Sequence, residues 1–303
     1  MSHPSETGCV ALESGKMCQV RANAKITLTV DVLRRLLSEY HEIEAVMQEV
    51  DFFDAVYLRE SKLNKITVTT TCTALPTDSR NLAWKAANEV RAYCGVERGV
   101  YIHVEKRIPI GSGLAGGSSD AAAVIRGLNN LWGLGLSLEE MLTIGEKVSM
   151  DTCFCLVGGV AMVKGKGEIV CPVISAKALE LVIANPGFPI MTREAYTLLD
   201  WTRVGKTGST SRMIQALESG DASSIGRCLH NDFECSILSR YPVLSEVKRV
   251  ILDHGALGAL LSGSGSSIFG ILSPDVDKIG LRSSLDRLCN LVVFTTAVAY
   301  GRL

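Results

Sequence analysis

Alternation of apolar and polar residues predicts the first strands of this chain. From Lys25 to Val30 the sequence reads Lys-Ile-Thr-Leu-Thr-Val, the period-two pattern of a strand with one buried and one polar face. The same alternation runs from Val100 to Val104. Short apolar runs at residues 56–58 and 66–68 predict two more strands. We expect the alternating strands to be half-buried, with Lys25 on a face that meets solvent.

Helical spacing of apolar residues predicts three helices in the same half of the chain. Apolar residues recur three and four positions apart over residues 121–131. Residues 82–90 show the same spacing after Asn81, a common N-cap residue. The sequence from Ser137 to Glu140 is a capping box, so a further helix is expected to start there and to end near Val148.

The second half mixes strands and helices. The expected elements are a hairpin of residues 159–163 and 168–173, a buried strand at 181–184, a helix from Thr192, a glycine-serine turn at 262–267 between two strands, and a closing strand at 291–297. We place a domain boundary at the end of the hairpin. This gives an N-terminal domain of residues 20–172 and a C-terminal domain of residues 173–303.

Composition bounds the class of protein. The 303 residues are 47% hydrophobic and 21% charged, a globular balance that can support two domains. A net charge of -1 gives no sign of the excess positive charge that nucleic-acid binding requires. The apolar runs are far shorter than a membrane span. The ten cysteines are scattered without a Cys-x-x-Cys pair, so neither a zinc site nor a disulfide framework is indicated. Free thiols in the cytoplasm are expected.

Residues 1–19 are polar, carry Glu6 and Glu13, contain no arginine and lack an apolar run. A secretory signal needs an apolar segment, and a transit peptide is rich in arginine. We therefore expect a loose N-terminal extension.

Residues 109–122 form the most distinctive segment, with the sequence Pro-Ile-Gly-Ser-Gly-Leu-Ala-Gly-Gly-Ser-Ser-Asp-Ala-Ala. They join the strand at 100–104 to the helix at 121–131. Glycines let the backbone approach a ligand closely, and the free N–H groups of the first helical turn point at it. Ser118 and Ser119 can add hydroxyl donors or cap the helix. The segment therefore predicts an anion site, for which a nucleotide phosphate is the natural ligand.

Three other interpretations of this loop are weaker. Gly111, Gly113 and Gly116 spell G-x-G-x-x-G, but a dinucleotide fold needs an acidic residue after a second strand about 20 residues later, and residues 129–136 contain neither. A P-loop would end in Lys-Ser or Lys-Thr, which is missing here. A purely structural turn would not need seven Gly and Ser among residues 111–119, because each glycine adds unfolded-state entropy.

The pattern Pro-x-x-x-Gly-Leu-x-Gly-Gly-Ser-Ser before an alanine-rich helix resembles the ATP loop of the GHMP kinases, which phosphorylate small molecules. The resemblance runs from about Val20 to the C-terminus. It implies an α+β fold of two domains, a ribosomal protein S5 domain 2-like N-terminal half and a ferredoxin-like C-terminal half, with the active site in the cleft between them. The ATP-binding residues that it implies are Pro109, Gly111, Ser112, Gly113, Leu114, Ala115, Gly116, Gly117, Ser118, Ser119, Asn81 and Lys106.

Two further motifs carry the catalytic residues that the resemblance implies. Ala24-Lys25-Ile26-x-Leu28 matches the family's first motif, with Thr27 in place of the usual Asn. Asp151 matches the family's catalytic Asp, although its neighbours Ser149, Met150, Thr152 and Cys153 differ from the family's Gly, Ala, Val and Pro. Asp151 would accept or orient the proton of the substrate hydroxyl, while Lys25 would keep it ionised and offset developing charge.

The loop ending Gly-Gly-Ser-Ser-Asp resembles one branch of the family, which transfers the γ-phosphoryl group of ATP, with Mg²⁺, to the 2-hydroxyl of 4-diphosphocytidyl-2-C-methyl-D-erythritol in the non-mevalonate isoprenoid route. In that branch a Tyr-His pair and a second aromatic residue clamp the cytosine, although Asp-Gly stands where this chain has Ser38-Glu39. The substrate-binding residues implied here are Tyr40, His41, Tyr196, Thr27 and Thr192.

Two alternatives stay open at this stage. The first is a GHMP kinase for another alcohol, such as homoserine or mevalonate, and the second is a non-catalytic ligand-binding relative. The preferred interpretation is a cytoplasmic kinase of a small molecule, without a nucleic-acid or membrane partner, that is a monomer or a weak homodimer.

Overall fold

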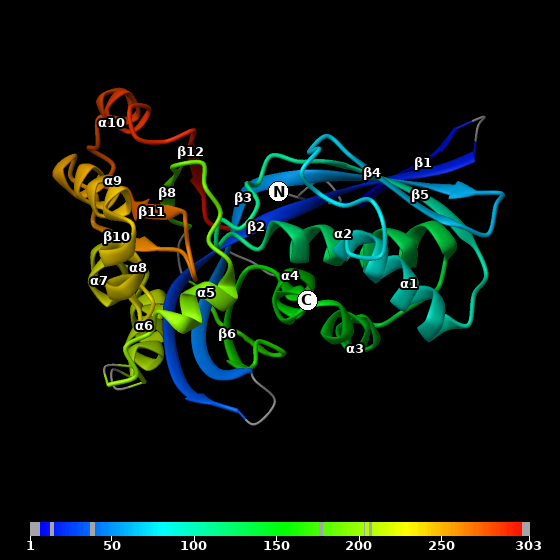
Figure 1. Ribbon diagram of the computed structural model, residues 1–303, viewed down its shortest axis with the longest axis horizontal. Coiled ribbons are helices and arrows are strands. Elements are labelled where there is room, and N and C mark those ends of the chain that lie inside the picture. Colours follow the sequence, from blue (N-terminus) through cyan, green and yellow to red (C-terminus); the bar gives the residue numbers. More distant parts are fainter. Residues whose placement is uncertain are drawn as a thin grey trace.

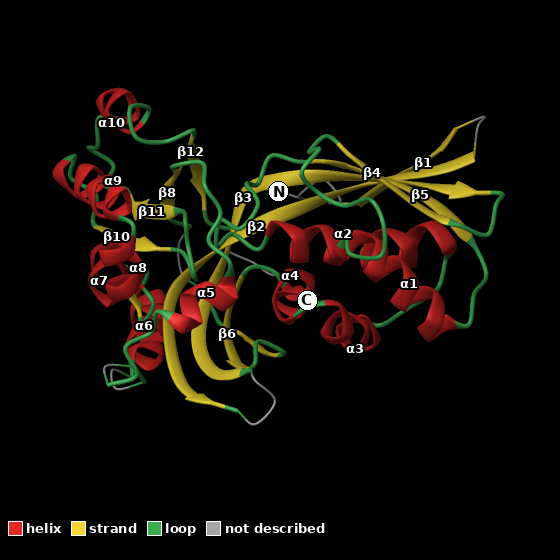
Figure 2. Cartoon of the chain, in the orientation of Figure 1, coloured by secondary structure: helices red, strands yellow, loops and turns green. Residues whose placement is uncertain are grey.

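The computed structural model describes residues 7–12, 15–36, 40–175, 178–202, 204–205 and 208–298. It has two α+β halves joined through long, curved strands (Figures 1 and 2). Ser38 and Glu39 lie outside the described residues.

The larger sheet contains eight strands. They are β1 (Thr7–Leu12), β2 (Gly15–Arg35), β3 (His41–Ser61), β4 (Ile66–Thr70), β5 (Gly99–Glu105), β6 (Val160–Gly165), β7 (Ile169–Pro172) and β9 (His230–Asn231). Five of them follow the order β1-β2-β3-β5-β4, β6 pairs with β3 and β7, and β9 pairs with β2. The predicted hairpin is confirmed as β6 and β7.

Strands β2 and β3 are 21 residues long and pair with each other through three irregularities. One irregularity lies between Asn23 and Lys25 on β2, where the register moves from Phe53 to Glu49 on β3. A bulge bends its strand and redirects the side chains around it. Lys25 therefore lies where the two-stranded ribbon bends from one half of the molecule toward the other.

Three helices pack on one face of this sheet, α1 (Leu82–Cys94), α2 (Gly116–Trp132) and α4 (Met150–Val157), and α3 (Leu138–Val148) packs on all three of them (Figure 1). The Asn81 side chain caps α1 and the predicted capping box starts α3. Helix α4 begins one residue after Ser149, which ends α3, so Asp151 comes to lie in the first turn of a new helix.

The smaller sheet has the antiparallel order β10-β11-β8-β12, built from β8 (Glu180–Asn185), β10 (Gly258–Leu261), β11 (Ile268–Ile271) and β12 (Leu291–Thr296). This is the ferredoxin-like order that was expected. Six helices accompany it: α5 (Thr192–Thr197), α6 (Ser209–Ser219), α7 (Ala222–Cys228), α8 (Glu234–Arg240), α9 (Pro242–Asp253) and α10 (Lys278–Leu285). The boundary expected at residues 172/173 falls between β7 and β8.

Two expectations need correction. Lys25, Thr27 and Thr29 do not meet solvent; they are buried, because the Lys25 ammonium lies against Gly113 and beside Gly263, and β9 pairs with β2 at Thr29. Residues 7–12 and 15–19 are not a loose extension, because β1 pairs antiparallel with the start of β2, in the register Thr7 to Val20. Backbone hydrogen bonds hold this segment in the sheet, although its sequence lacks the apolar alternation from which a strand is predicted.

In the part of the chain that the structure describes, no helix is long and apolar enough to cross a membrane. Free thiols are found at Cys72, Cys94, Cys153, Cys171, Cys228 and Cys289, and burial raises the pKa of Cys155 and Cys153. Both thiols are therefore protonated at neutral pH and unreactive.

Candidate active site

The glycine loop between β5 and α2 takes a left-handed backbone at Gly111 (φ 59°), Gly113 (φ 76°) and Ala115 (φ 57°). A Cβ atom on Gly113 would lie 1.9 Å from the carbonyl oxygen of Ser262, so only glycine permits this approach. The loop delivers the chain into α2 with the N–H groups of Gly116, Gly117 and Ser118 at the helix end. Within the described residues these N–H groups have no acceptor, which leaves them for an anion.

A second turn, residues 262–267, packs directly on this loop. The Ser262 hydroxyl donates to the Gly113 carbonyl at 3.0 Å, and the Ser267 N–H donates to the Ser112 carbonyl at 3.0 Å. Asn231 holds the turn from the other side by donating to the carbonyls of Leu261 and Gly263 at 2.8 Å each. The two glycine-serine turns therefore form one rigid unit at the junction of the two halves.

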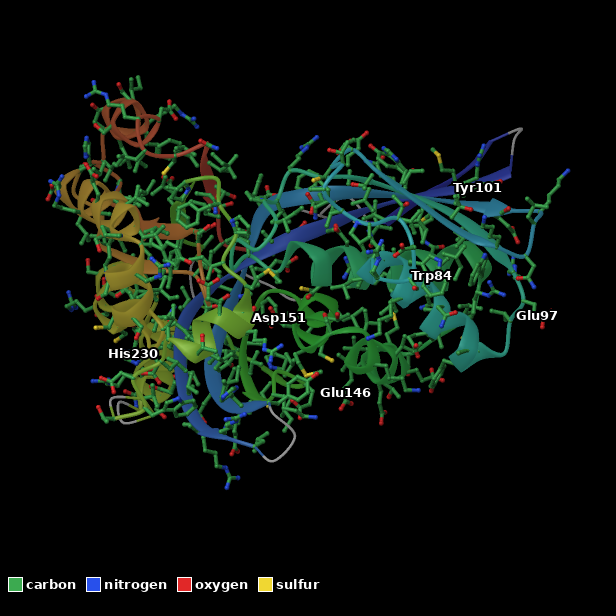
Figure 3. The ribbon with its side chains drawn as sticks, in the orientation of Figure 1. Trp84, Glu97, Tyr101, Glu146, Asp151 and His230 are labelled. Carbon is green, nitrogen blue, oxygen red and sulfur yellow. The ribbon has the colours of Figure 1, made fainter. Side chains whose placement is uncertain are left out.

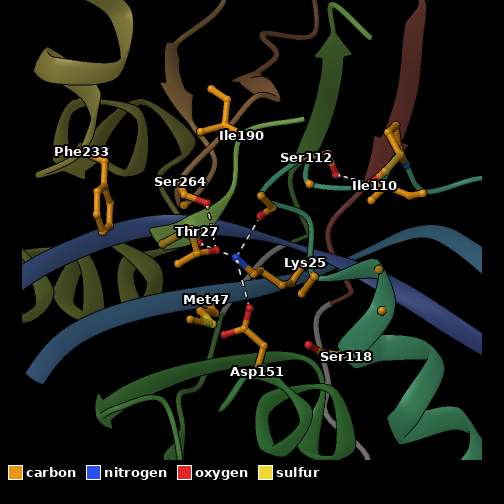
Figure 4. Close-up of a pocket in the computed structure, with 18 of the residues that line it drawn as sticks. Lys25, Thr27, Met47, Ile110, Ser112, Ser118, Asp151, Ile190, Phe233 and Ser264 are labelled. Atoms are coloured by element: carbon orange, nitrogen blue, oxygen red, sulfur yellow. Dashed lines mark hydrogen bonds and ion pairs between the residues drawn. The ribbon is translucent and has the colours of Figure 1, made fainter. Parts of the chain in front are cut away.

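Lys25 and Asp151 face each other across the cavity beside this unit (Figure 4). The Lys25 ammonium lies 4.0 Å from the Asp151 carboxylate and donates to the Thr27 hydroxyl at 3.0 Å and to the Gly113 carbonyl at 2.9 Å. Thr27, which replaces the family's Asn, thus retains a hydrogen bond to the lysine. The Asp151 side chain is one-third exposed (34%) whereas that of Lys25 is buried (5%), so the carboxylate is the group that a substrate can reach.

Hydroxyl groups connect the loop to the helix that carries Asp151. The Ser149 hydroxyl donates to the Ser118 hydroxyl at 2.9 Å and lies 2.6 Å from that of Thr152. Ser149 and Thr152 are both departures from the family pattern. They provide a polar link between the phosphate loop and α4 that the family's glycine and valine could not make.

The Lys106 side chain is buried and ion-paired. Its ammonium pairs with Asp54 and, at 2.7 Å, with Asp120 on α2. Burial raises the pKa of the Asp120 carboxyl despite the adjacent lysine. Burial acts to lower the pKa of Lys106, but the charges of Asp120 and Asp54 outweigh it, so the pKa of Lys106 is raised. Asp54 also accepts the N–H of Ile108 at 2.9 Å. This buried group fixes the start of the glycine loop, and Lys106 lines the cavity with its charge already balanced.

Two cavities meet at Asp151. One, of about 380 Å³, is lined by the glycine loop and by apolar side chains that include Leu75 and Leu82. The other, of about 610 Å³, is lined by Tyr40, His41 and Tyr196. The residues common to both are Ile43, Ser118, Asp151, Thr192 and Tyr196. A nucleotide in the first cavity and a second molecule in the other would therefore approach the same carboxylate.

Aromatic rings gather in the second cavity. The His41 ring stacks on Tyr196 with centroids 3.9 Å apart and planes 7° apart, and Phe233 meets Tyr196 edge-on. Burial, together with Arg35, lowers the pKa of His41, so its imidazole is neutral at pH 7. Burial, together with the charge of Asp151, raises the pKa of Tyr196. Tyr40 is half exposed (51%), with the Lys166 ammonium over its ring at 5.6 Å.

The structure brings most of the sequence-predicted site residues onto these two cavities, but three side chains lie elsewhere. The Asn81 amide caps α1 and donates to the Pro76 carbonyl at 2.7 Å. Leu114 is fully buried in the core. Ser119 donates its hydroxyl to the Asn23 carbonyl at 2.6 Å and its N–H to Ala115. Ser119 therefore has no donor left for a phosphate, because α2 and β2 use both.

Several lining residues carry no sequence signal. Apolar side chains from distant segments complete the first cavity: Val30, Ile43, Met47, Leu75, Leu82, Ile190 and Phe233. Nothing in the sequence distinguishes them from core residues, and only the fold brings them together.

Comparison with known proteins places this site in a family. The chain matches the profile of the GHMP kinases N terminal domain over residues 81–159 and that of the GHMP kinases C terminal domain over residues 213–290. It is 41% identical over 256 residues to the 4-diphosphocytidyl-2-C-methyl-D-erythritol kinase of Alkaliphilus metalliredigens, covering 84% of this chain and 88% of that protein. Identity to the enzyme of the same name from Caldicellulosiruptor saccharolyticus is 41% over 277 residues, with 91% and 96% covered.

Solved structures agree in fold. A crystal structure of 4-(cytidine 5'-diphospho)-2C-methyl-D-erythritol kinase is 27% identical, with a TM-score of 0.77 over 92% of this chain and 99% of that one. A homoserine kinase from Cytophaga hutchinsonii is 23% identical, with a TM-score of 0.72 over 92% and 95%, a likeness of fold. The chain is thus similar over most of its length to kinases of one kind and shares their two-domain α+β architecture: it belongs to the GHMP kinase family.

Proposed function

We propose that this GHMP kinase transfers the γ-phosphoryl group of ATP to the 2-hydroxyl of 4-diphosphocytidyl-2-C-methyl-D-erythritol, giving the 2-phosphate and ADP, as a step of the non-mevalonate isoprenoid route. The observation that carries the proposal is the junction of two cavities at Asp151, one beside a phosphate loop and the other lined by aromatic rings. The names of the relatives with 41% identity point to the same reaction.

The first cavity suits ATP. The free N–H groups at the start of α2 and the positive end of the helix dipole would bind the β- and γ-phosphates. Leu75 and Leu82, which line this cavity, would contact the adenine. Mg²⁺ would neutralise phosphate charge, and the Ser118 hydroxyl and Asp151 carboxylate on the same cavity are hard oxygen ligands of the kind it prefers.

The reaction itself needs positioning and charge stabilisation more than covalent chemistry. The substrate oxygen attacks the γ-phosphorus, the bond from that phosphorus to the bridging oxygen of ADP breaks, and the hydroxyl proton passes to Asp151. Lys25, 4.0 Å from Asp151, offsets the negative charge that gathers around the transferring group. Its bonds to Thr27 and Gly113 hold it in place throughout.

The second cavity suits the cytidine diphosphate part of the substrate. Tyr196 and Tyr40 would stack on the two faces of the cytosine and His41 would bond to its edge. A base on an aromatic ring contributes roughly 1–3 kcal/mol. Lys166 and Arg193 line the same cavity, where their positive charges complement a diphosphate.

An assay of ADP release with three alcohols tests the proposal. We expect turnover with 4-diphosphocytidyl-2-C-methyl-D-erythritol and none above background with mevalonate or homoserine. Turnover with either of the latter two alone would refute the substrate assignment while leaving the kinase family intact. Absence of turnover with every alcohol would favour a non-catalytic relative.

A further inference from the structure

His41 contacts two aromatic rings and not only the one expected from the clamp. Its ring centroid is 3.9 Å from that of Tyr196 and 5.4 Å from that of Trp201, with planes 7° and 24° apart. Two rings on the same face of a small imidazole would touch each other, and within the described residues no ring contact joins Tyr196 to Trp201. Tyr196 and Trp201 therefore cover opposite faces of His41.

This stack conflicts with a cytosine on Tyr196. A base stacks at the same separation that the imidazole already occupies, so His41 must leave Tyr196 before a base can use that face. Trp201 follows α5 and is 44% exposed, so its contact with His41 is not part of a packed core. It remains a stacking partner for His41 after Tyr196 is taken.

We propose that Trp201 is a positioning residue of the nucleobase subsite, an inference that rests on the proposed function. In the unliganded protein His41 occupies the place of the base. When a cytosine binds to Tyr196, His41 stays on Trp201 and turns the edge of its ring toward the base. Trp201 thereby sets base selectivity through His41 without contacting the reacting atoms.

The chemistry of the two rings supports this role. A neutral imidazole carries one N–H donor and one acceptor nitrogen. The cytosine edge offers an amino donor beside an acceptor nitrogen, whereas the uracil edge reverses both groups and offers a carbonyl acceptor beside an N–H donor. An imidazole held in one orientation can thus distinguish the two bases, while a freely rotating one cannot.

Trp201→Leu and Trp201→Phe test the proposal, with Trp84→Phe as the control. Trp84 lies on α1, away from Asp151 (Figure 3). Loss of one aromatic contact should raise the Kd of CDP and the KM of the cytidine substrate about three- to tenfold in Trp201→Leu. Its selectivity for CDP over UDP should fall, while kcat and the KM of ATP stay unchanged. Trp201→Phe should stay within about twofold of the wild type, because a ring is retained.

Tryptophan fluorescence gives a measurement on the unaltered protein. CDP should change the emission of the wild type and of Trp84→Phe, and this change should disappear in Trp201→Phe. If CDP binds with unchanged emission, and Trp201→Leu keeps the wild-type affinity and selectivity, Trp201 has no positioning role and only this inference fails. If CDP neither binds to the wild type nor competes with the substrate, the inference and the proposed function fail together.

Discussion

The two glycines Gly113 and Gly117 should respond in opposite ways to the same added methyl group. In Gly113→Ala, the new Cβ would lie 1.9 Å from the Ser262 carbonyl oxygen and 3.0 Å from the Gly265 nitrogen, both backbone atoms of the second turn. Its φ of 76° is also unfavourable for alanine. Overpacking costs about 1–3 kcal/mol and a left-handed residue about 1–2 kcal/mol, so we expect a destabilisation of about 2–5 kcal/mol.

Gly117 lies in the first turn of α2 with ordinary helical backbone, and a Cβ there meets only the flexible tip of Leu82, at 3.3 Å. Alanine in a helix is about 0.5–1 kcal/mol more stable than glycine. Gly117→Ala should therefore keep or slightly raise the stability. Its methyl group would project into the phosphate cavity and weaken one charge-assisted hydrogen bond, worth about 1.5–3 kcal/mol, so the KM of ATP should rise about tenfold or more.

Urea unfolding and steady-state kinetics on both variants distinguish these effects. The expected result is a lower unfolding midpoint for Gly113→Ala and an intact fold with weak ATP binding for Gly117→Ala. A wild-type midpoint for Gly113→Ala would show that the two turns do not pack as described. A wild-type KM of ATP for Gly117→Ala would show that the helix end does not bind the phosphates.

Three further predictions concern single side chains. Asp151→Asn removes the charge and keeps the size, so turnover should fall about 10²- to 10⁴-fold with ATP binding retained in calorimetry; near-normal turnover would exclude Asp151 as the acid/base. Tyr196→Ala should raise the KM of the cytidine substrate about tenfold and leave that of ATP unchanged, because stacking contributes equally to ground and transition states; an equal rise in both would contradict the clamp. Hydrogen bonding to Asp232 raises the pKa of His230. The contribution of His230 to stability is therefore complete below pH 6.5 and is lost as the pH rises through the folded-state pKa. His230→Asn should lower the free energy of unfolding more at pH 6 than at pH 9, and an equal loss at both pH values would refute this assignment.

Local patterns in the sequence predicted the local structure well. The capping box at Ser137, the N-cap at Asn81 and the hairpin of β6 and β7 all formed as expected, because each depends on residues a few positions apart. The family resemblance also placed Lys25 and Asp151 on one cavity, although they lie far apart in the sequence.

Long-range packing was beyond the sequence. The face of β2 that carries Lys25 reads as a solvent face, and it is buried because two turns from distant parts of the chain place Gly113 and Gly263 against the lysine. Lys106 reads as a lysine that could reach the nucleotide or stay solvated, and its pairing with Asp54 from β3 depends on the fold. Trp201 belongs to no motif, and only the fold brings it onto His41.

The most direct test of the central claim is identification of the product. The protein is incubated with ATP and 4-diphosphocytidyl-2-C-methyl-D-erythritol, and the products are identified by phosphorus NMR. One new phosphomonoester signal should appear, with phosphorus–carbon coupling that assigns the phosphate to the 2-position. Its amount should equal that of the ADP formed. The diphosphate signals of the substrate should persist, and Asp151→Asn should form no product in the same time. ADP without a new phosphomonoester, or a phosphate on another hydroxyl, would contradict the account.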